Sequence, residues 1–381
     1  MGIDSPERTW VRVLLFDNHR EYTVATPAGF TAEGVDNGVA VDFSDTEEMQ
    51  VGLRDGRICV GPHLLNREVV LRPKDPFYFT IDGQGFRGDL HLQVNEDANS
   101  IEAVNHVPVE SYLLGVVGAE IHSYWEPEAI KAQAVAARTY CLAIQNRFGS
   151  RRSWDVTRTQ SNQVYDGLAA ENSRIRRAVL ETTGQILIAP HEDGHEAIFP
   201  AYYSSSCGGH TEDSQSVFGN DAVPLTGVGC TWCQRIARHR DFYWGPMFYT
   251  MDTVSAQLVA RYPSLGRLER IVDVEVVRTG YRERIVYVRL IGANGLKDSL
   301  RGEDFRLSLD PTGRRLKSAL VTMTKSKGGL LFENGRGFGH GVGLCQCGAQ
   351  GMARQGRDYR EILSFYYPGS KLVTIETALT P

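Results

Sequence analysis

The stretch VPVESYLLGVVGAEIHSYWEPEAIKAQAVAARTYCLAIQNR, residues 107–147, decides the fold, because its pattern predicts two helices joined by a short bend. The first helix should begin after Pro108 and end at Glu120. The second should open with Pro127, since a proline at the first helical position with acidic neighbours is typical of a helix start. Its narrow, alanine-rich apolar stripe predicts a buried helix that another element approaches closely.

Glu120 lies at the bend between these two expected helices, with Trp125 close by in the sequence. Apolar and aromatic surroundings disfavour a charged carboxylate, so we expect a raised pKa that suits a general acid. The alternative is an ordinary exposed acid at a helix end. Glu110 and Glu128 are its nearest rivals, but each lies in the first turn of its helix, where the macrodipole favours the ionised form.

Length and composition are those of an ordinary globular protein. The chain has 381 residues, of which 42% are hydrophobic and 23% charged, and its net charge is −5. This charge, without any basic run, argues against a nucleic-acid partner. No run of eighteen apolar residues predicts a membrane span. The start MGIDSPERTWVRVLL lacks the basic and apolar segments of a secretory signal.

We expect an α+β fold, a mixed β-rich scaffold around the central helical pair. Short alternating runs predict a β-rich region at residues 1–105, which we interpret as scaffold, with its loops as a possible wall of a binding cleft. Residues 106–244 should form the core with the helical pair and a cysteine-containing loop. Residues 245–328 should form an inserted α/β module, and residues 329–381 a glycine-rich block that completes the core.

Two short-spaced pairs of metal-ligating residues follow one another in the core. Cys207 and His210 form the first pair, and Cys230 and Cys233 form the second. This spacing is typical of zinc sites, and four protein ligands favour a structural ion over a catalytic one. The alternatives are free cysteines, a disulfide between Cys230 and Cys233, or a ligand set that includes His239.

The segment GRGFGHGVGLCQCGAQGMA, residues 335–353, contains seven glycines that let the backbone turn sharply and approach a ligand. It is neither a dinucleotide-binding fingerprint nor a P-loop. Cys345 and Cys347 are too close in sequence for a relaxed disulfide, so we do not expect a bridge between them. Cys59 and Cys141 are best interpreted as buried apolar cysteines.

Five ordered blocks resemble the sporulation stage II protein D family, the lytic transglycosylases and amidase enhancers of bacterial cell walls. The blocks are VPVESYLLGVVGAE (107–120), EAIKAQAVAARTY (128–140), NQVYDG (162–167), YYSSSCGGHTED (202–213) and GRGFGHGVGLCQCGAQGMARQG (335–356). Weaker likeness extends over nearly the whole chain. Because several family members lack cysteines at the matching positions, the resemblance implies that a metal is dispensable to the reaction class.

The resemblance implies that Glu120 is the catalytic acid of a peptidoglycan lytic transglycosylase. Such an enzyme cleaves between N-acetylmuramic acid and N-acetylglucosamine and leaves a 1,6-anhydro end. One glutamate suffices, because the sugar's own C6 hydroxyl attacks the anomeric carbon. The first alternative is a non-catalytic wall-binding enhancer of an amidase. The second is a zinc peptidase, which should carry a His-Glu-x-x-His motif on a helix, and none of the helices expected from the sequence carries one.

Seven residues of the resembling blocks are candidates for contact with glycan. Amide, phenol and hydroxyl groups suit hydrogen bonding to sugars, and an aromatic ring can stack on a sugar face. As single residues, those in the NQVYDG and YYSSSCGGHTED blocks are more often plain scaffold. The candidates are Gln163, Tyr165, Tyr203, Ser205, Phe338, His340 and Gln346.

A cell-wall substrate places the expected site of action in the cell envelope, in the periplasm or outside the cell. The expected partners are peptidoglycan glycan strands and, for an enhancer, an amidase. Because residues 1–15 do not read as a signal, we expect that an export signal is absent from this sequence or that export uses another route.

Overall fold

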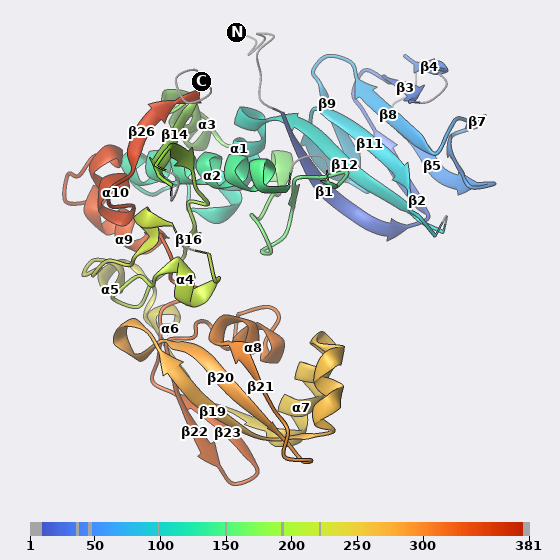
Figure 1. The fold of residues 1–381 in the computed structure, drawn as a ribbon. Coiled ribbons are helices and arrows are strands. Elements are labelled where there is room, and N and C mark those ends of the chain that lie inside the picture. The colour runs from blue at the N-terminus through green and yellow to red at the C-terminus, as the bar shows by residue number, and fades with distance from the viewer. Residues whose placement is uncertain are drawn as a thin grey trace. The chain divides into compact units, whose positions relative to one another are not determined.

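The computed structural model describes residues 10–35, 38–44, 48–97, 99–148, 151–191, 194–220 and 222–375. It divides into two compact units (Figure 1). Unit 1 comprises Met1–Trp125 and Ala137–Gln185, and unit 2 comprises Glu126–Ala136 and Ile186–Pro381. Helices make up 30% and strands 37% of the structure, so the predicted α+β class is confirmed.

Every described element from Trp10 to Pro108 is a strand. These strands are β1 (Trp10–His19), β2 (Glu21–Ala25), β3 (Phe30–Gly34), β4 (Ala40–Phe43), β5 (Glu48–Arg54), β6 (Arg57–Val60), β7 (His63–Leu64), β8 (Glu68–Pro73), β9 (Tyr78–Ile81), β10 (Gln84–Arg87), β11 (Asp89–Val94) and β12 (Ile101–Pro108). With β13 (Val156–Thr157), they form a sheet in the order β13-β1-β12-β11-β8-β3-β4 and a second in the order β10-β9-β2-β5-β6-β7.

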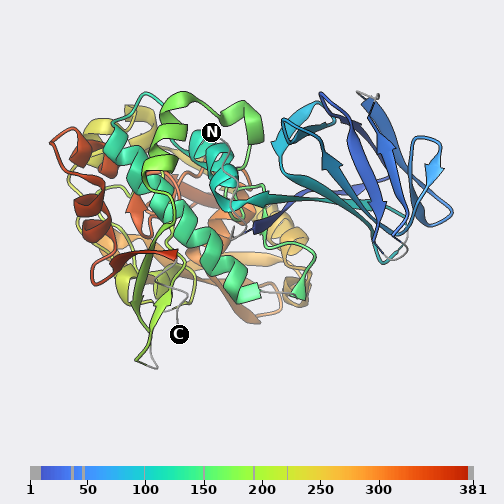
Figure 2. The same ribbon diagram turned by 90° about the horizontal axis from the view of Figure 1, so that it is seen from above.

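The two sheets of unit 1 lie against each other (Figure 2), and apolar residues of both are buried. Alternate residues are buried along β2 in one sheet and along β11 in the other, as expected for strands with one face on a core. Tyr22 of β2 donates a hydrogen bond of 2.8 Å from its hydroxyl to the carbonyl of Ile101 in the opposite sheet. This bond satisfies a buried phenol and joins the two layers.

Helix α1 (Val109–Glu120) follows β12 directly, and α2 (Pro127–Phe148) begins at the predicted proline. The predicted start and end of α1 are therefore confirmed. Helix α1 packs closely on the 3-10 helix η2 (Gly167–Ala170), because Gly118 has no side chain to hold them apart. A Cβ at Gly118 would lie 2.1 Å from the carbonyl oxygen of Ala170. Helix α3 (Ser173–Glu181) also contacts α1.

The chain pattern predicts an irregular loop over residues 151–167 that ends in a strand at residues 163–165, but these three residues form no strand in the structure, so that prediction is wrong. Side-chain hydrogen bonds hold this segment instead of a sheet ladder. Gln163 accepts a bond of 3.1 Å from the hydroxyl of Tyr112 and donates one of 3.2 Å to the carbonyl of Ala137. Tyr165 donates one of 3.0 Å to the side chain of Asn105.

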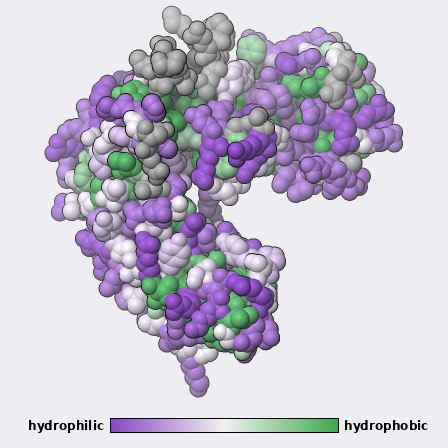
Figure 3. Space-filling model, in the orientation of Figure 1, coloured by the Kyte–Doolittle hydropathy of each residue, from purple (hydrophilic) through white to green (hydrophobic). Residues whose placement is uncertain are grey.

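Unit 2 contains a module with its own apolar core, built from two three-stranded sheets and two helices. One sheet has the order β19-β20-β21 and the other the order β18-β23-β22. The elements are β18 (Met247–Thr250), α7 (Met251–Arg261), β19 (Ile271–Thr279), β20 (Ile285–Gly292), β21 (Lys297–Arg301), α8 (Gly302–Leu309), β22 (Thr322–Ser326) and β23 (Gly329–Glu333). Strands β19 and β20 pair antiparallel on either side of Gly280. Figure 3 shows hydrophobic residues as small patches among hydrophilic ones on the face that it draws.

The rest of unit 2 surrounds a short parallel pair of strands, β16 (Tyr203–Ser204) and β25 (Leu344–Cys345). Its other elements are β14 (Gln185–Pro190), β15 (Glu196–Ile198), α4 (Ser214–Val217), η3 (Val223–Leu225), α5 (Cys233–Ile236), α6 (His239–Phe242), β17 (Tyr243–Trp244), β24 (Gly335–Arg336), α9 (Gln346–Ala353), α10 (Tyr359–Tyr366) and β26 (Lys371–Thr374). The pair β16 and β25 brings the 202–213 and 335–356 blocks together.

Candidate functional site

Glu120 is the last residue of α1 and is half-buried. The helix ends there because Ile121 takes an extended conformation and its buried side chain turns into the core. The backbone N–H of Val164 donates a hydrogen bond of 2.9 Å to Oε1 of Glu120. The NQVYDG block therefore orients the Glu120 carboxyl, which connects two of the five resembling blocks within unit 1.

The two rival carboxylates are held in structural ion pairs. Glu110 binds the guanidinium of Arg138 through both oxygens, at 2.9 and 2.7 Å. Glu128 pairs with Lys131 at 2.8 Å and accepts a bond of 2.9 Å from the backbone N–H of Tyr359. Both carboxylates are therefore held by ion pairs and hydrogen bonds within the fold.

Gln163 and Tyr165, two of the predicted glycan contacts, are buried inside unit 1. Gln163 is fully buried, and Tyr165 is 1% exposed. The ring of Tyr165 packs between Phe86 and Tyr112, at centroid distances of 5.5 and 4.9 Å. Their hydrogen bonds hold the loop that carries Val164.

The structure brings the other five predicted contacts together in unit 2, around β16 and β25. Tyr203 is paired with Leu344 in these strands, and the carbonyl of Ser205 accepts a bond of 3.0 Å from the N–H of Cys347. The ring of Phe338 is half-buried, with Nζ of Lys317 5.6 Å from its centroid. Gln346 is 5% exposed, and its amide donates a bond of 3.4 Å to Gln133.

His340 uses both ring nitrogens for backbone contacts. Nε2 lies 2.8 Å from the carbonyl oxygen of Tyr203, and Nδ1 lies 3.0 Å from the backbone N–H of Val342. These partners require a proton on Nε2 and none on Nδ1, which is the neutral ring. Burial lowers the pKa of His340 to about 4. The ring therefore holds the glycine-rich loop against β16.

Four buried cysteines form a cluster in unit 2 that could bind a metal ion. The sulfurs of Cys207, Cys230, Cys233 and Cys345 all lie within 4.8 Å of one another. Those of Cys207 and Cys233 are 3.7 Å apart, far beyond the length of a disulfide bond. Four sulfurs at about 2.3 Å from a tetrahedral zinc ion are about 3.8 Å apart, so the spacing fits such an ion.

The surroundings of the cluster also suit thiolate ligands. The backbone N–H groups of Cys207 and Gly348 point at Sγ of Cys345, at 3.3 and 3.4 Å. The hydroxyl of Tyr366 lies 3.2 Å from Sγ of Cys230. Hydrogen bonding from Cys207 lowers the pKa of the Cys230 thiol. Donors aimed at sulfur are the outer contacts that metal-bound thiolates require.

The cluster differs from the expected ligand set at one position, because it contains Cys345 in place of His210. The His210 ring stacks on Tyr281 at 4.2 Å, and its Nδ1 lies 2.6 Å from the carbonyl oxygen of Thr211. His239 instead packs against Tyr243 at 5.2 Å. A signal for Cys345 was present in the sequence, because its CQC segment is another short-spaced pair of cysteines in the glycine-rich block.

A buried ion pair next to the cluster was not expected from the sequence. Arg284 and Glu212 are each 1% exposed, with Nε of Arg284 4.0 Å from Oε2 of Glu212. Arg284 also donates a bond of 2.9 Å to the carbonyl of Cys207. Because Arg284 immediately precedes β20, this bond links the two-sheet module to the cysteine cluster.

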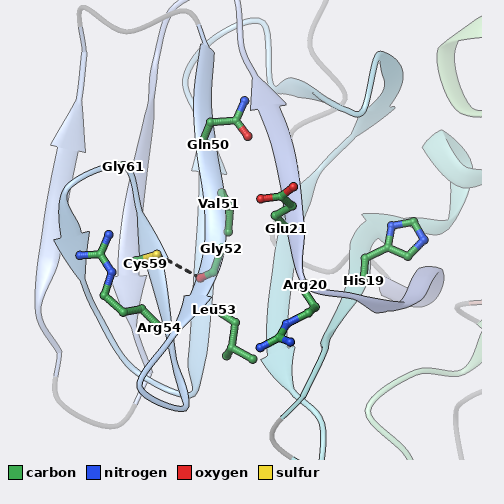
Figure 4. A pocket seen from close by; sticks show the side chains of 10 residues that line it. All are labelled: His19, Arg20, Glu21, Gln50, Val51, Gly52, Leu53, Arg54, Cys59 and Gly61. Atoms are coloured by element: carbon green, nitrogen blue, oxygen red, sulfur yellow. Dashed lines mark hydrogen bonds between the residues drawn. The ribbon is translucent and has the colours of Figure 1, made fainter.

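A separate hollow of about 770 Å³ lies in unit 1 between β2, β5 and β6 (Figure 4). Charged side chains such as Arg20, Glu21 and Arg54 line it, and the thiol of Cys59 donates to the carbonyl of Gly52 at 3.2 Å. The lining includes none of the site residues predicted from the sequence.

Comparison with known proteins connects this geometry to a family. The family described as "Stage II sporulation protein" (SpoIID) matches residues 97–188, which contain Glu120 and its partner Val164. The stage II sporulation protein D of Bacillus amyloliquefaciens is 29% identical, over 74% of this chain and 78% of that protein. An uncharacterized protein of Brachyspira hyodysenteriae is 31% identical, over 77% of this chain and 74% of that protein.

A protein named amidase enhancer from Bacillus subtilis is 27% identical, over 92% of this chain and 54% of that protein. With the α+β fold and the five blocks, these matches show that the chain belongs to the SpoIID family. Among the described residues, no helix has both the length and the hydropathy to cross a membrane.

Proposed function

We propose that the protein is a peptidoglycan lytic transglycosylase that cleaves glycan strands between N-acetylmuramic acid and N-acetylglucosamine. The observation that carries this proposal is the placement of Glu120. It is a half-buried carboxyl at the end of α1, and the N–H of Val164 in the NQVYDG block orients it. The names of the relatives support a role at the cell wall, and so a site of action in the cell envelope.

In the proposed reaction, protonated Glu120 gives its proton to the glycosidic oxygen as the bond from the anomeric carbon of N-acetylmuramic acid breaks. The C6 hydroxyl of the same sugar attacks that carbon, and its proton returns to the Glu120 carboxylate. One C–O bond breaks and one forms, so no water is consumed. The products are a free C4 hydroxyl on N-acetylglucosamine and a 1,6-anhydro muramic end.

The test is digestion of purified glycan strands by the Glu120→Gln variant. An amide cannot donate and recover the proton, so we expect a loss of at least about 100-fold in the rate of strand cleavage. Glu128→Gln is the matched control, because it removes a carboxylate eight residues further along the chain whose partners are structural. Undiminished cleavage by the Glu120→Gln variant would remove this residue from the mechanism.

The second candidate is a non-catalytic enhancer that binds the wall and activates an amidase. The observation that favours it is the match over 92% of this chain to a protein with the name amidase enhancer. Under this alternative, glycan strands keep their length in the presence of the protein, while a partner amidase releases stem peptides faster. Strand length and released peptides therefore separate the two functions.

For the cysteine cluster, we propose a structural Zn²⁺ held by Cys207, Cys230, Cys233 and Cys345. The support is the all-sulfur donor set, its spacing and the donors aimed at Cys345. Four thiolates complete the coordination, so the ion supplies cross-linking and not chemistry. In this role it fixes the 202–213 block, the loop with Cys230 and the glycine-rich block to one another.

A further inference from the structure

Two aromatic rings face solvent directly after Glu120, in the bend that joins α1 and α2. The rings of His122 and Tyr124 are nearly parallel, with centroids 5.1 Å apart and planes 12° apart. Tyr124 is 68% exposed, and His122 is also exposed. Single exposed aromatic residues are common and need no explanation. A stacked exposed pair is different, because it offers a wide flat surface with polar groups at its edges.

The bend that carries these rings is firmly held by the rest of unit 1. The residues that flank the rings, Ile121 and Trp125, are 5% and 8% exposed and pack into the core. The N–H of Trp125 donates a bond of 3.0 Å to the carbonyl of His122. The side-chain rings of His122 and Trp125 also meet edge to face, with centroids 5.5 Å apart.

Helix α3 holds the other end of this short segment. The guanidinium of Arg174 donates a bond of 2.8 Å to the carbonyl of Trp125. At its start, the N–H of Ile121 donates a bond of 3.1 Å to Val117 in α1. The rings are therefore presented in one arrangement before any ligand arrives, which lowers the entropic cost of binding.

We propose that His122 and Tyr124 form a platform on which a sugar ring of the glycan strand stacks, next to the bond that Glu120 cleaves. This inference rests on the proposed function and names a subsite for it. Four residues separate Glu120 from Tyr124, so their Cα atoms lie within about 14 Å. A strand with one sugar at Glu120 can thus place a neighbouring sugar on the rings. The apolar C–H face of a pyranose matches the ring faces, and its hydroxyls reach the phenol and imidazole edges.

The test measures the dissociation constant of purified, peptide-free glycan strands by calorimetry, with every variant made in the Glu120→Gln background so that bound strands stay intact. Adding Tyr124→Ala should weaken binding about tenfold, as loss of an aromatic stacking partner does elsewhere. Adding Tyr124→Phe should change it less than about twofold, because the ring face remains. Adding His122→Ala should also weaken strand binding.

Tyr281 provides the matched control, because it is a 47% exposed tyrosine stacked on a histidine in unit 2. Tyr281→Ala should leave strand binding unchanged. The inference is overturned if Tyr124→Ala binds as tightly as its parent, if Tyr281→Ala loses as much, or if the Glu120→Gln parent binds no strands. Failure of the proposed function looks different, because the unmodified protein then makes no anhydro product whether or not Tyr124→Ala weakens binding.

Discussion

Arg138 binds both carboxylate oxygens of Glu110, with Nε 2.9 Å from Oε1 and Nη2 2.7 Å from Oε2. Arg138 is fully buried, and it also donates a bond of 2.9 Å to the carbonyl of Gln185. Glu110 accepts a further bond of 3.1 Å from the N–H of Gly184. This pair joins the first turn of α1 to α2, and so it fixes the helix that ends at Glu120.

Replacing Arg138 with Met should destabilise the protein strongly, because the Glu110 carboxylate then loses its cation in a partly buried place. We expect a loss of about 3–5 kcal/mol in the free energy of unfolding, measured with denaturant. Arg177→Met is the control. It removes an ion pair with Glu181 from the surface of α3, where Arg177 is 81% exposed, and should leave the free energy of unfolding nearly unchanged. Equal losses in the two variants would contradict this account.

Gly118→Ala should destabilise the protein although alanine favours a helix. A Cβ at Gly118 would lie 2.1 Å from the carbonyl oxygen of Ala170, so α1 and η2 would have to separate. The expected cost is about 1–3 kcal/mol, with reduced turnover because the segment with Val164, which orients Glu120, leads directly into η2. Gly266→Ala is the control, because no atom lies within 4 Å of the position that its Cβ would take. A gain in stability for Gly118→Ala would show that the close approach is not needed.

Cys345→Ser should lose bound zinc, while Cys347→Ser should keep it. Both cysteines are buried and only two residues apart, but only Cys345 belongs to the four-sulfur cluster. Loss of one ligand should lower the zinc content per chain. It should also lower the melting temperature by roughly 5–10 °C. Atomic emission measures the zinc content of the two variants and so shows which cysteine is a ligand. Equal zinc content in both variants would exclude Cys345 as a ligand.

The protein should lose stability in mild acid through two stacked histidines in unit 1. The ring centroids of His91 and His106 are 3.3 Å apart. Burial is the main cause that lowers the pKa of His91 to about 3 and that of His106 to about 4. Arg72 also lowers the pKa of His91, and Arg12 that of His106. An unfolded histidine titrates near pH 6.5, so below that pH the unfolded chain binds protons that the folded chain does not.

The stability that these histidines contribute is thus complete above pH 6.5 and is lost as the pH falls toward 4. His106→Gln should flatten this decline by about 2 kcal/mol, measured as the free energy of unfolding across that range. The same pH profile in the variant and the unmodified protein would show that His106 is not responsible.

The helical pair could be read from the sequence because helix periodicity and capping are local signals. Pro127 marks the start of α2, and the predicted alanine-rich stripe of α2 is buried in the structure. The failure at residues 163–165 has a physical reason. The side chains of Gln163 and Tyr165 hydrogen-bond to Tyr112 and Asn105 instead, and such tertiary partners leave no periodic pattern in the sequence.

The metal cluster was only partly readable for a similar reason. The short spacing of Cys230 and Cys233 is a local signal, whereas the fourth sulfur comes from β25, far along the chain. The pairing of β16 with β25 is what brings Cys345 to Cys207. His340 is a similar case. In the sequence it looks available to a ligand, but in the structure both of its ring nitrogens have backbone partners.

The most direct test of the central claim is the mass of the products formed from peptide-free glycan strands by the unmodified protein. If Glu120 acts alone as acid and base, every new muramic end carries a 1,6-anhydro ring and lacks the mass of one water relative to a hydrolysed end. Products that contain that water, or strands of unchanged length, would contradict the account.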